Sequence, residues 1–330
     1  LDQVPEANEQ GHPLGRHLDG YRIGFDLGAS DRKVSAVIDG EAVYSEEVVW
    51  QPRQQTDPDY HYSEIMKALR SAESKMPRLD AIGGSSAGIY VNNRPMVASL
   101  YRGIPAEKFD RIKNMFLRIK EEFQVPLEVV NDGDVTALAG SMSLNDNEVL
   151  GLAMGSSEAV GYVDKEGHIT GWLNELAFAP VDYSPTAPVD EWSGDKGVGA
   201  LYFSQQCVFR LAPRVGIELP AGVADAARLK HVQEFLEEGH SGARKIWETI
   251  GIYLGYALAH YADFYSLKHV IILGRVTSGS GGEIILEATK RVLASEFPEL
   301  VEQIEIQLPD EKSRRVGQSI AAASLPTLVE

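Results

Sequence analysis

The chain has 330 residues, enough for two domains with separate cores, and its 44% hydrophobic and 24% charged residues are typical of a globular protein. Its formal net charge of −17 argues against a nucleic-acid partner, because such a surface repels phosphate backbones. One cysteine, Cys207, excludes an internal disulfide, and the lack of a long apolar run or a signal-like N-terminal stretch predicts a cytoplasmic protein without a membrane partner.

The first half of the chain predicts a β-meander followed by alternating helices and strands. Residues 1–20 are polar and rich in Pro, Gly and His, and we interpret them as a lead-in. Alternating apolar residues between tight turns then predict three antiparallel strands, at Tyr21–Gly28, Arg32–Asp39 and Glu41–Trp50. The patterns that follow predict a helix at Asp59–Met76, a strand at Asp80–Gly84, a helix at Pro105–Gln124 and a strand at Pro126–Val130.

The second half repeats this order without close sequence repetition. Its meander has strands at Glu148–Gly155 and Ala159–Asp164. Later elements are a helix at Ala243–Phe264, a strand at His269–Leu273, a helix at Glu283–Ser295, a strand at Glu305–Leu308 and a helix at Val316–Leu325. Two halves of one pattern predict an α/β protein of two related domains with a cleft between them. We expect residues 21–131 and the closing helix at 314–330 to form one domain, and residues 132–313 the other.

Two turns have residues suited to phosphate binding. Asp26-Leu27-Gly28-Ala29-Ser30 joins two strands, and its backbone N–H groups could cradle phosphate oxygens while Asp26 holds Mg²⁺ through water. Alone, this motif is a weak signal, and a plain hairpin turn with an Asp bonded to its own backbone is the favoured interpretation. Gly155-Ser156-Ser157 occupies the same place in the second meander. Turns at equivalent points of two related domains could together clamp a triphosphate.

Asp132 is the best catalytic candidate. It lies in Asn131-Asp132-Gly133-Asp134 at a strand-to-helix junction, and α/β sheets present their functional edge at the carboxyl ends of strands. A carboxylate there could accept the proton of a hydroxyl that attacks a phosphoryl group. Helix capping is the alternative, and we expect Asp132 or Asp134 to cap the helix. Gly274-Arg275 with the loop at 278–282 is either a nucleotide-binding loop or a flexible connection.

Six segments, in order, resemble the ROK family (repressors, open reading frames and sugar kinases) of the actin-like ATPase superfamily: residues 21–40, 81–93, 129–140, 151–178, 267–274 and 317–325. The resemblance implies two ribonuclease-H-like domains and an ATP- and Mg²⁺-dependent kinase of a small-molecule sugar, with Asp132 as the base. It implies sugar contacts at Gly88, Asn92, Asn131 and Glu175. It implies phosphate or nucleotide contacts at Asp26, Gly28, Ser30, Lys33, Gly155, Ser156 and Gly274. Family members are often dimers, so a homodimer is expected.

The sequence departs from the family at its zinc site. Family members hold zinc with a His and a Cys-x-Cys-Gly-x-x-Gly-Cys run. Here Gly194 and Gly197 keep the glycine spacing, whereas the four ligand positions hold Phe178, Glu191, Ser193 and Val198. We therefore expect no zinc, and a loop anchored by packing of Trp192. A family glutamate that touches the sugar aligns with Ala200, so we expect the sugar to be bound differently from glucose.

Two other functions are compatible with the resemblance. A non-catalytic sugar- or metabolite-binding protein would explain why the phosphate-binding motifs differ from those of the family, with Arg275 in place of a glycine. The retention of Asp26, Asp132 and Glu175 counts against this alternative. Family repressors carry a winged helix-turn-helix domain before the segment that corresponds to residues 21–40 here. Residues 1–20 are too few for such a domain, and the acidic charge also argues against DNA binding, so we reject the repressor unless an upstream domain was removed.

Overall fold

The computed structural model describes residues 14–309 and 311–328. The chain divides into two compact units, each built around a β-sheet. The first comprises Leu1–Asp146, Tyr162–Asn174 and Arg315–Glu330, and the second comprises Asn147–Gly161 and Glu175–Arg314. Helices and strands alternate in both, so the predicted α/β class is confirmed. Within the described residues, no helix combines the length and the hydrophobicity needed to cross a membrane.

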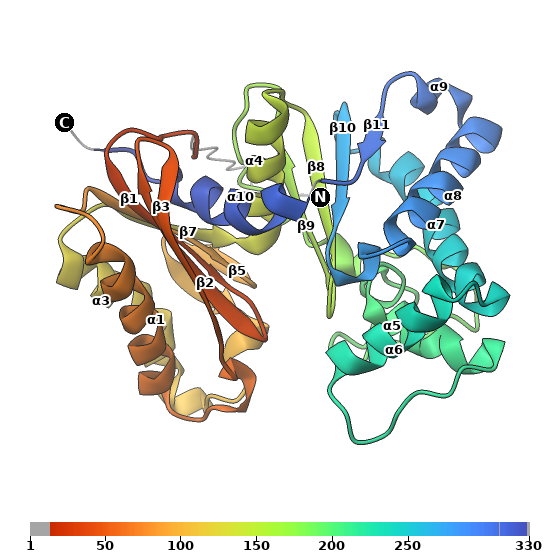
Figure 1. Ribbon diagram of the computed structural model, residues 1–330, viewed down its shortest axis with the longest axis horizontal. Coiled ribbons are helices and arrows are strands. Elements are labelled where there is room, and N and C mark those ends of the chain that lie inside the picture. The colour runs from red at the N-terminus through yellow and green to blue at the C-terminus, as the bar shows by residue number, and fades with distance from the viewer. Residues whose placement is uncertain (1–13, 310, 329–330) are drawn as a thin grey trace, which may run out of the picture. The chain divides into compact units, whose positions relative to one another are not determined.

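The first unit is built on a five-stranded sheet in the order β3-β2-β1-β4-β7 (Figure 1). Its strands are β1 (Tyr21–Leu27), β2 (Asp31–Ile38), β3 (Glu41–Val49), β4 (Ala81–Ser86) and β7 (Leu127–Asn131). The first three form the predicted antiparallel meander, while β4 pairs parallel to β1 and β7 parallel to β4. The register aligns Leu27 with Ser86, and Ser86 with Asn131. The carboxyl ends of β1, β4 and β7 therefore meet at one edge of the sheet.

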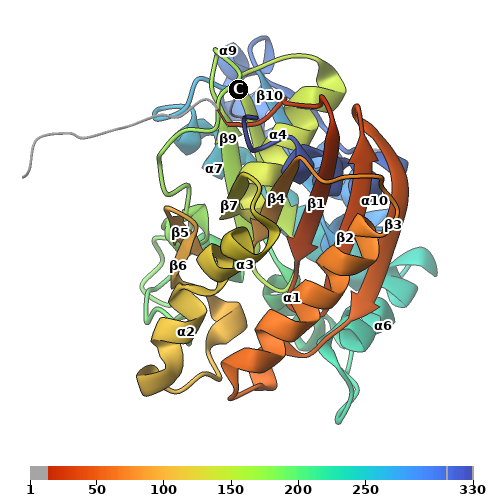
Figure 2. The ribbon, with the colours of Figure 1, turned by 90° about the vertical axis from the view of Figure 1, so that its left-hand side faces the viewer.

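Helices cover both faces of this sheet (Figure 2). On one face lie α1 (Pro58–Glu73), α2 (Phe109–Lys113) and α3 (Met115–Phe123), which enclose a core that includes Phe25, Leu69 and Phe116. On the other face lie α4 (Asp132–Leu144) and α10 (Glu311–Ala323). These layers fix β1 and β4 from both sides, so their carboxyl ends are rigidly placed.

Two glycines let α10 lie directly against the sheet. A Cβ on Gly24 would stand 1.7 Å from the carbonyl oxygen of Ser319, and one on Gly83 would stand 1.6 Å from that of Ala322. No side chain fits at such distances, so the close approach of the helix backbone explains both glycines.

One predicted helix of the first unit is interrupted. The sequence predicts a single helix over Pro105–Gln124, but the structure has a 3₁₀ turn at Ala106–Lys108 and then α2 and α3, which meet at Asn114. The Asn114 Nδ2 donates to the carbonyl oxygen of Asp110 at 2.9 Å, and such local bonds compete with a regular helix. The apolar spacing identified the buried face and did not reveal the break.

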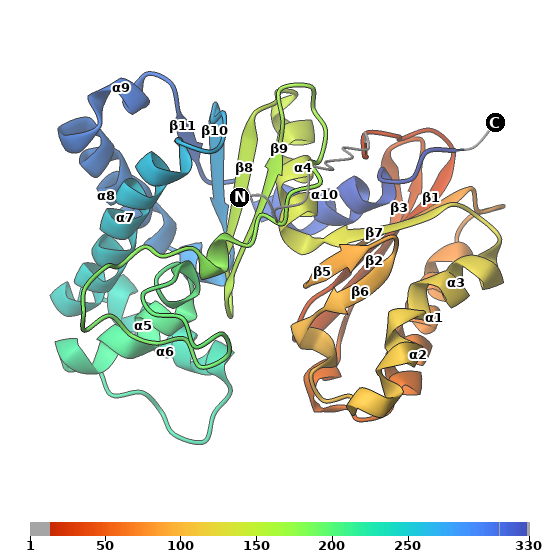
Figure 3. The same ribbon diagram turned by 180° about the vertical axis from the view of Figure 1, so that it is seen from behind.

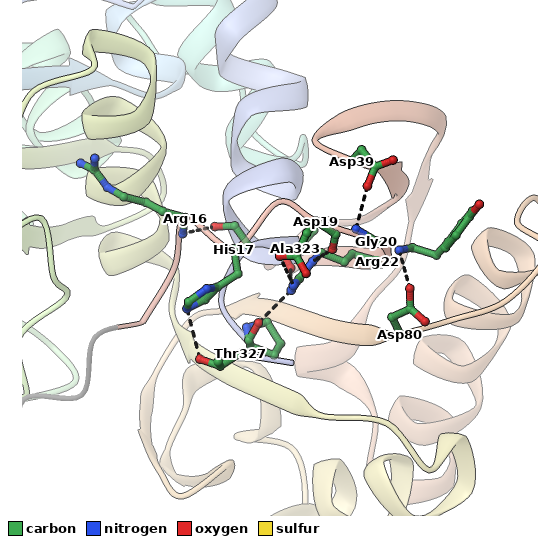
Figure 4. Close-up of polar contacts among 12 residues, drawn as sticks. Arg16, His17, Asp19, Gly20, Arg22, Asp39, Asp80, Ala323 and Thr327 are labelled. Atoms are coloured by element: carbon green, nitrogen blue, oxygen red, sulfur yellow. Dashed lines mark hydrogen bonds and ion pairs between the residues drawn. The ribbon is translucent and has the colours of Figure 1, made fainter. Parts of the chain in front are cut away.

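The ends of the described chain meet beside β1 (Figure 4). The His17 N–H donates to the Ser324 carbonyl oxygen at 3.1 Å. The fully buried Arg22 guanidinium donates to the carbonyl oxygens of Ala323 at 3.4 Å and Pro326 at 2.8 Å. These bonds satisfy carbonyls at the end of α10 and join it to the strand that contains Asp26.

The second unit contains a four-stranded sheet in the order β11-β10-β8-β9 (Figure 3). Its strands are β8 (Val149–Met154), β9 (Glu158–Val163), β10 (His269–Leu273) and β11 (Glu305–Gln307). β10 pairs parallel to β8 and β11. The helices are α5 (Gln205–Leu211), α6 (Asp225–Glu237), α7 (Ser241–Tyr261), α8 (Gly281–Glu296) and α9 (Pro298–Val301). The sequence did not predict α6, nor the hairpin of β5 (Ile89–Val91) and β6 (Arg94–Val97) in the first unit.

Candidate functional site

Asp26 is a buried carboxylate near the end of β1, and it is 6% exposed. Ser85, its neighbour on β4, donates its hydroxyl to Asp26 Oδ1 at 2.7 Å, and Lys33 on β2 places Nζ 3.5 Å from Oδ2. The carboxylate is therefore oriented by two polar partners. The sequence had singled out Asp26 and Lys33 but not Ser85.

The turn after β1 is short and well bonded. The Gly28 N–H donates to the Asp31 carbonyl oxygen at 2.9 Å, and the exposed Ser30 donates its hydroxyl to Asp31 Oδ2 at 2.7 Å. Lys33 Nζ lies 2.9 Å from Asp31 Oδ1. Burial tends to lower the pKa of Lys33, but the nearby carboxylates, Asp26 first among them, raise it above its usual value. The ammonium group therefore stays charged beside the turn.

Asn131 and Asp132 lie where β7 gives way to α4. The N-cap is Asn131, whose Oδ1 accepts from the Gly133 N–H at 2.7 Å. Asp132 Oδ1 accepts from the same N–H at 3.1 Å. Asp134 does not cap, since its Oδ1 accepts from Asn174 Nδ2 at 3.0 Å. The expectation that an acid is the N-cap was therefore wrong, because an asparagine one position earlier fits the cap geometry.

The side-chain NH₂ group of Asn131 reaches Gly88, another predicted sugar contact. Its Nδ2 donates to the Gly88 carbonyl oxygen at 2.8 Å. Gly88 has φ +125°, and a Cβ there would stand 2.5 Å from the Val97 carbonyl oxygen, so only glycine fits. Three predicted residues, Gly88, Asn131 and Asp132, therefore lie together at the sheet edge.

Tyr90 is a polar neighbour of Asp132 that the sequence did not single out. Its hydroxyl lies 2.6 Å from Ser86 Oγ, at the end of β4. Burial raises the pKa of Tyr90 well above its usual value, and the charge of Asp132 contributes to the rise. The Tyr90 phenol is therefore neutral, and it lies close enough to the Asp132 carboxylate to interact with it electrostatically.

Asn92 lies apart from this cluster. It is exposed in the turn between β5 and β6, with φ +51°. The adjacent Asn93 is buried and holds the start of β7, donating to the Leu127 carbonyl oxygen at 3.0 Å and accepting from the Val129 N–H at 2.7 Å. Asn131 is at the opposite end of that strand, so the structure does not bring Asn92 and Asn131 together.

In the second unit, the Gly155 turn and Gly274 adjoin each other. Gly155 follows β8, its N–H donates to the Ser157 carbonyl oxygen at 3.0 Å, and Ser156 is exposed. Gly274 follows β10 with φ +106°, and a Cβ there would stand 2.4 Å from the Met154 carbonyl oxygen. The parallel pairing of β8 and β10 explains why both glycines lie at the same edge of the sheet.

The loop after Gly274 is tied to α6. Gln233 Nε2 donates to the Arg275 carbonyl oxygen at 2.9 Å, and Glu237 Oε1 accepts from the Ser280 N–H at 2.8 Å. That bond lowers the pKa of Glu237. These two bonds hold the loop against α6, and its role in nucleotide binding stays a prediction. The Arg275 side chain is exposed.

Glu175 has a carboxyl neighbour that the sequence did not single out. Burial raises the pKa of Glu175, which lies just before the 3₁₀ turn η4 (Leu176–Phe178). Glu158, at the start of β9, is 5% exposed. Burial, and then the charge of Glu175, raises the pKa of Glu158 to about 8. Glu158 lies just before the strand predicted at Ala159–Asp164, so the apolar pattern did not mark it.

The loop at residues 178–200, which aligns with the family's zinc run, forms a hairpin of backbone hydrogen bonds. The Val181 N–H donates to the Gly197 carbonyl oxygen at 2.8 Å. Asp190 Oδ1 accepts from the Trp192 N–H at 3.0 Å and the Ser193 N–H at 2.8 Å. The Trp192 and Phe178 rings lie 5.5 Å apart. Among the described residues, no group of three or more His, Cys, Asp or Glu side chains is arranged to hold a metal ion.

The buried cysteine is inert in this setting. Cys207 lies on α5, as the apolar pattern indicated, and its side chain is fully buried. Burial raises the pKa of its thiol to about 11. A protonated, inaccessible thiol packs and does not act as a nucleophile.

Solved structures similar to the chain include ROK-family proteins. A ROK hexokinase from Thermus thermophilus superposes with a TM-score of 0.69 at 18% identity, covering 92% of this chain and 97% of its own. A ROK-family glucokinase from Streptomyces griseus, solved with glucose and AMPPNP, gives 0.66 at 19%, covering 92% and 99%. A ROK-family transcriptional regulator, homologous to an E. coli regulator, gives 0.68 at 14%, covering 93% and 79%.

The chain has the fold of these ROK structures. The predicted ribonuclease-H-like fold is therefore confirmed. No protein-family model matches the chain, and no curated protein matches its sequence. The ROK fold is shared here by kinases and a regulator, so the chemistry has to be inferred from the residues at the strand ends.

Proposed function

We propose that the protein is an ATP-dependent sugar kinase that transfers the γ-phosphoryl group to a sugar hydroxyl. Asp132 takes the proton of the attacking hydroxyl as general base. Asn131, Gly88 and Glu175 bind the sugar. Phosphate and nucleotide contacts come from Asp26, Gly28, Ser30, Lys33, Gly155, Ser156 and Gly274.

The shared sheet edge of β1, β4 and β7 is the observation that carries this proposal. The turn at residues 26–30, with its buried carboxylate and the charged lysine beside it, lies on the same edge as Asn131 and Asp132. An acceptor hydroxyl and a phosphoryl group must meet for transfer, and neighbouring strand ends can hold both. The ROK fold and its solved sugar kinases add to this support.

Asp26, with Asp31 nearby, is the carboxylate that we propose holds a magnesium ion. Kinases hold Mg²⁺ with one or two carboxylates, waters and substrate phosphates. Asp26 and Asp31 lie 3.5 and 2.9 Å from Lys33 Nζ, so hard oxygen donors and a fixed cation adjoin the phosphate turn. When bound at Asp26, the ion would offset negative charge on the phosphates. Lys33 supplies further positive charge from the protein itself.

A coupled assay of ADP release, run with ATP, Mg²⁺ and a panel of sugars, tests the proposal. The diagnostic variant is Asp132→Asn, which preserves the size of the side chain while Asn131 still caps α4. We expect it to lower kcat by about 10²–10⁴-fold. The matched control is Asp110→Asn, an exposed aspartate on α2, which should leave kcat unchanged. Undiminished transfer by Asp132→Asn would refute Asp132 as the base.

A non-catalytic sugar-binding protein is the second candidate. It is favoured by bonds that already occupy groups in the proposed phosphate turn and in the loop after Gly274. Lys33 is already held by two carboxylates, and the Ser280 N–H is already bonded to Glu237. A nucleotide would have to compete with these partners. Titration calorimetry separates the candidates: sugar binding with no detectable binding of ATP–Mg²⁺ would favour the sensor and contradict the kinase.

A further inference from the structure

Glu158 is a buried carboxyl group with no structural partner. It is 5% exposed, and neither carboxyl oxygen has a hydrogen-bond partner among the residues that the structure describes. A buried polar group without a partner costs free energy, so its retention calls for an explanation. Its position at the start of β9 would suit an apolar residue, since the rest of the strand is mainly apolar.

The surroundings of Glu158 give its carboxyl group room. A Cβ on Gly199 would stand 2.1 Å from Glu158 Oε2 and 2.7 Å from the Leu176 carbonyl oxygen, so only glycine at 199 leaves space for the glutamate. Tyr261, at the end of α7, is 1% exposed, and its hydroxyl also has no partner within the described chain. Burial and then the charge of Glu158 raise the pKa of Tyr261, so the two groups are close.

Glu175 is the third member of this cluster. Its carboxyl is partly exposed and interacts electrostatically with Glu158. All these residues belong to the second unit. Two carboxyl groups whose ionisation is disfavoured, by burial at both and by the charge of Glu175 at Glu158, accept a cationic hydrogen-bond donor better than a neutral one.

We propose that Glu158 and Glu175 bind a primary ammonium group, and that the sugar bound by this protein is an amino sugar with a free amine. The inference rests on the proposed function in that Glu175 is taken as a sugar contact. The ammonium donates to the two carboxyl groups, and the Tyr261 hydroxyl adds a polar partner. An acetylated amine carries no charge, so the N-acetyl sugar is excluded from the preferred substrates.

Titration calorimetry of the full chain at pH 7, without nucleotide, tests the ammonium site. The probes are D-glucosamine, D-glucose and N-acetyl-D-glucosamine. Glucosamine should bind about tenfold or more tightly than the other two. Because Glu158 is protonated before binding and a cation would ionise it, binding should release about one proton, measured by repeating the titration in buffers of different ionisation enthalpy.

Glu158→Gln should abolish both the glucosamine preference and the proton release, and Glu175→Gln should weaken the preference. Glu302→Gln, at an exposed glutamate after α9, is the control and should change neither. Thermal melts establish that each variant is folded before titration.

The possible outcomes separate this inference from the proposed function. Equal binding of glucosamine and glucose, or no binding of either, would overturn the ammonium site. The same proton release with MgCl₂ alone would show a metal site in its place. If glucose is phosphorylated without a preference for glucosamine, the kinase stands and the ammonium site falls. If glucosamine binds with proton release but no sugar is phosphorylated, the site stands and the kinase falls.

Discussion

The buried carboxyl group of Glu158 should make the free energy of unfolding depend on pH, whatever the function of the protein. Its pKa is raised from 4.5 to about 8 in the folded protein. Between these pH values the folded chain keeps a proton that the unfolded chain has released. The free energy of unfolding therefore falls as pH rises through this range. This contribution is complete below pH 4.5 and is lost as pH passes 8.

The size of the effect follows from the shift. A rise from 4.5 to about 8 corresponds to roughly 4–5 kcal/mol of pH-dependent stability, since each pKa unit is worth about 1.4 kcal/mol. Roughly 2 kcal/mol of this falls between pH 6 and pH 8. Glu158→Gln cannot titrate and should lack this slope. The other titrating groups are common to both proteins and cancel when the two are compared.

Urea unfolding at pH 6, 7 and 8, followed by circular dichroism, measures the slope. The free energy of unfolding of the wild type should fall by about 2 kcal/mol more than that of Glu158→Gln over this range. Glu302→Gln, a fully hydrated glutamate by comparison, should behave as the wild type does. If the wild type and Glu158→Gln show the same pH dependence, Glu158 is ionised at neutral pH and the account of its burial is wrong.

Three further predictions concern other parts of the chain. Asp132→Asn should leave the melting temperature within a few degrees of the wild type while kcat falls, because α4 keeps its asparagine cap; a large loss of stability would mean that Asp132 is structural. Gly274→Ala should cost about 2–4 kcal/mol in urea unfolding, because its φ of +106° and its contact with backbone leave no room for a Cβ; Gly216→Ala, with φ +81° and open space, should cost only about 1 kcal/mol. Trp192→Ala should change the free energy of unfolding by less than about 1 kcal/mol, because Trp192 is 63% exposed. Asp190→Ala should speed proteolysis within residues 178–200, because it frees the two N–H groups that the Asp190 carboxylate holds.

Strand ends were predictable from the sequence, and the neighbours of each strand were not. Apolar runs that stop at polar residues marked the ends of β1 and β7, so Asp26 and Asp132 could be singled out before any fold was known. Which strand lies between them depends on pairing over long sequence separations, and β4 occupies that place. Ser85 bonds to Asp26 only through this pairing, so local pattern alone could not assign it a role.

Glu158 illustrates the opposite limit. A glutamate in a strand pattern is usually a solvated residue. Local sequence cannot show that Gly199 faces this one from another part of the chain. Its burial is a property of packing. The break at Asn114 was missed for a related reason, since apolar spacing reports which face is buried and is unchanged by one irregular turn.

The glycines of the loop at 178–200 show how one pattern can have two explanations. In sequence, Gly194 and Gly197 match the spacing of the family's metal-binding run. In the structure both have positive φ, +79° and +68°, and a Cβ on Gly197 would stand 2.0 Å from the Asp182 carbonyl oxygen. The hairpin itself therefore requires these glycines, whether or not a metal is bound. The backbone bonds that close the loop do not depend on which side chains occupy the four ligand positions, so the loop can keep its path when those side chains change.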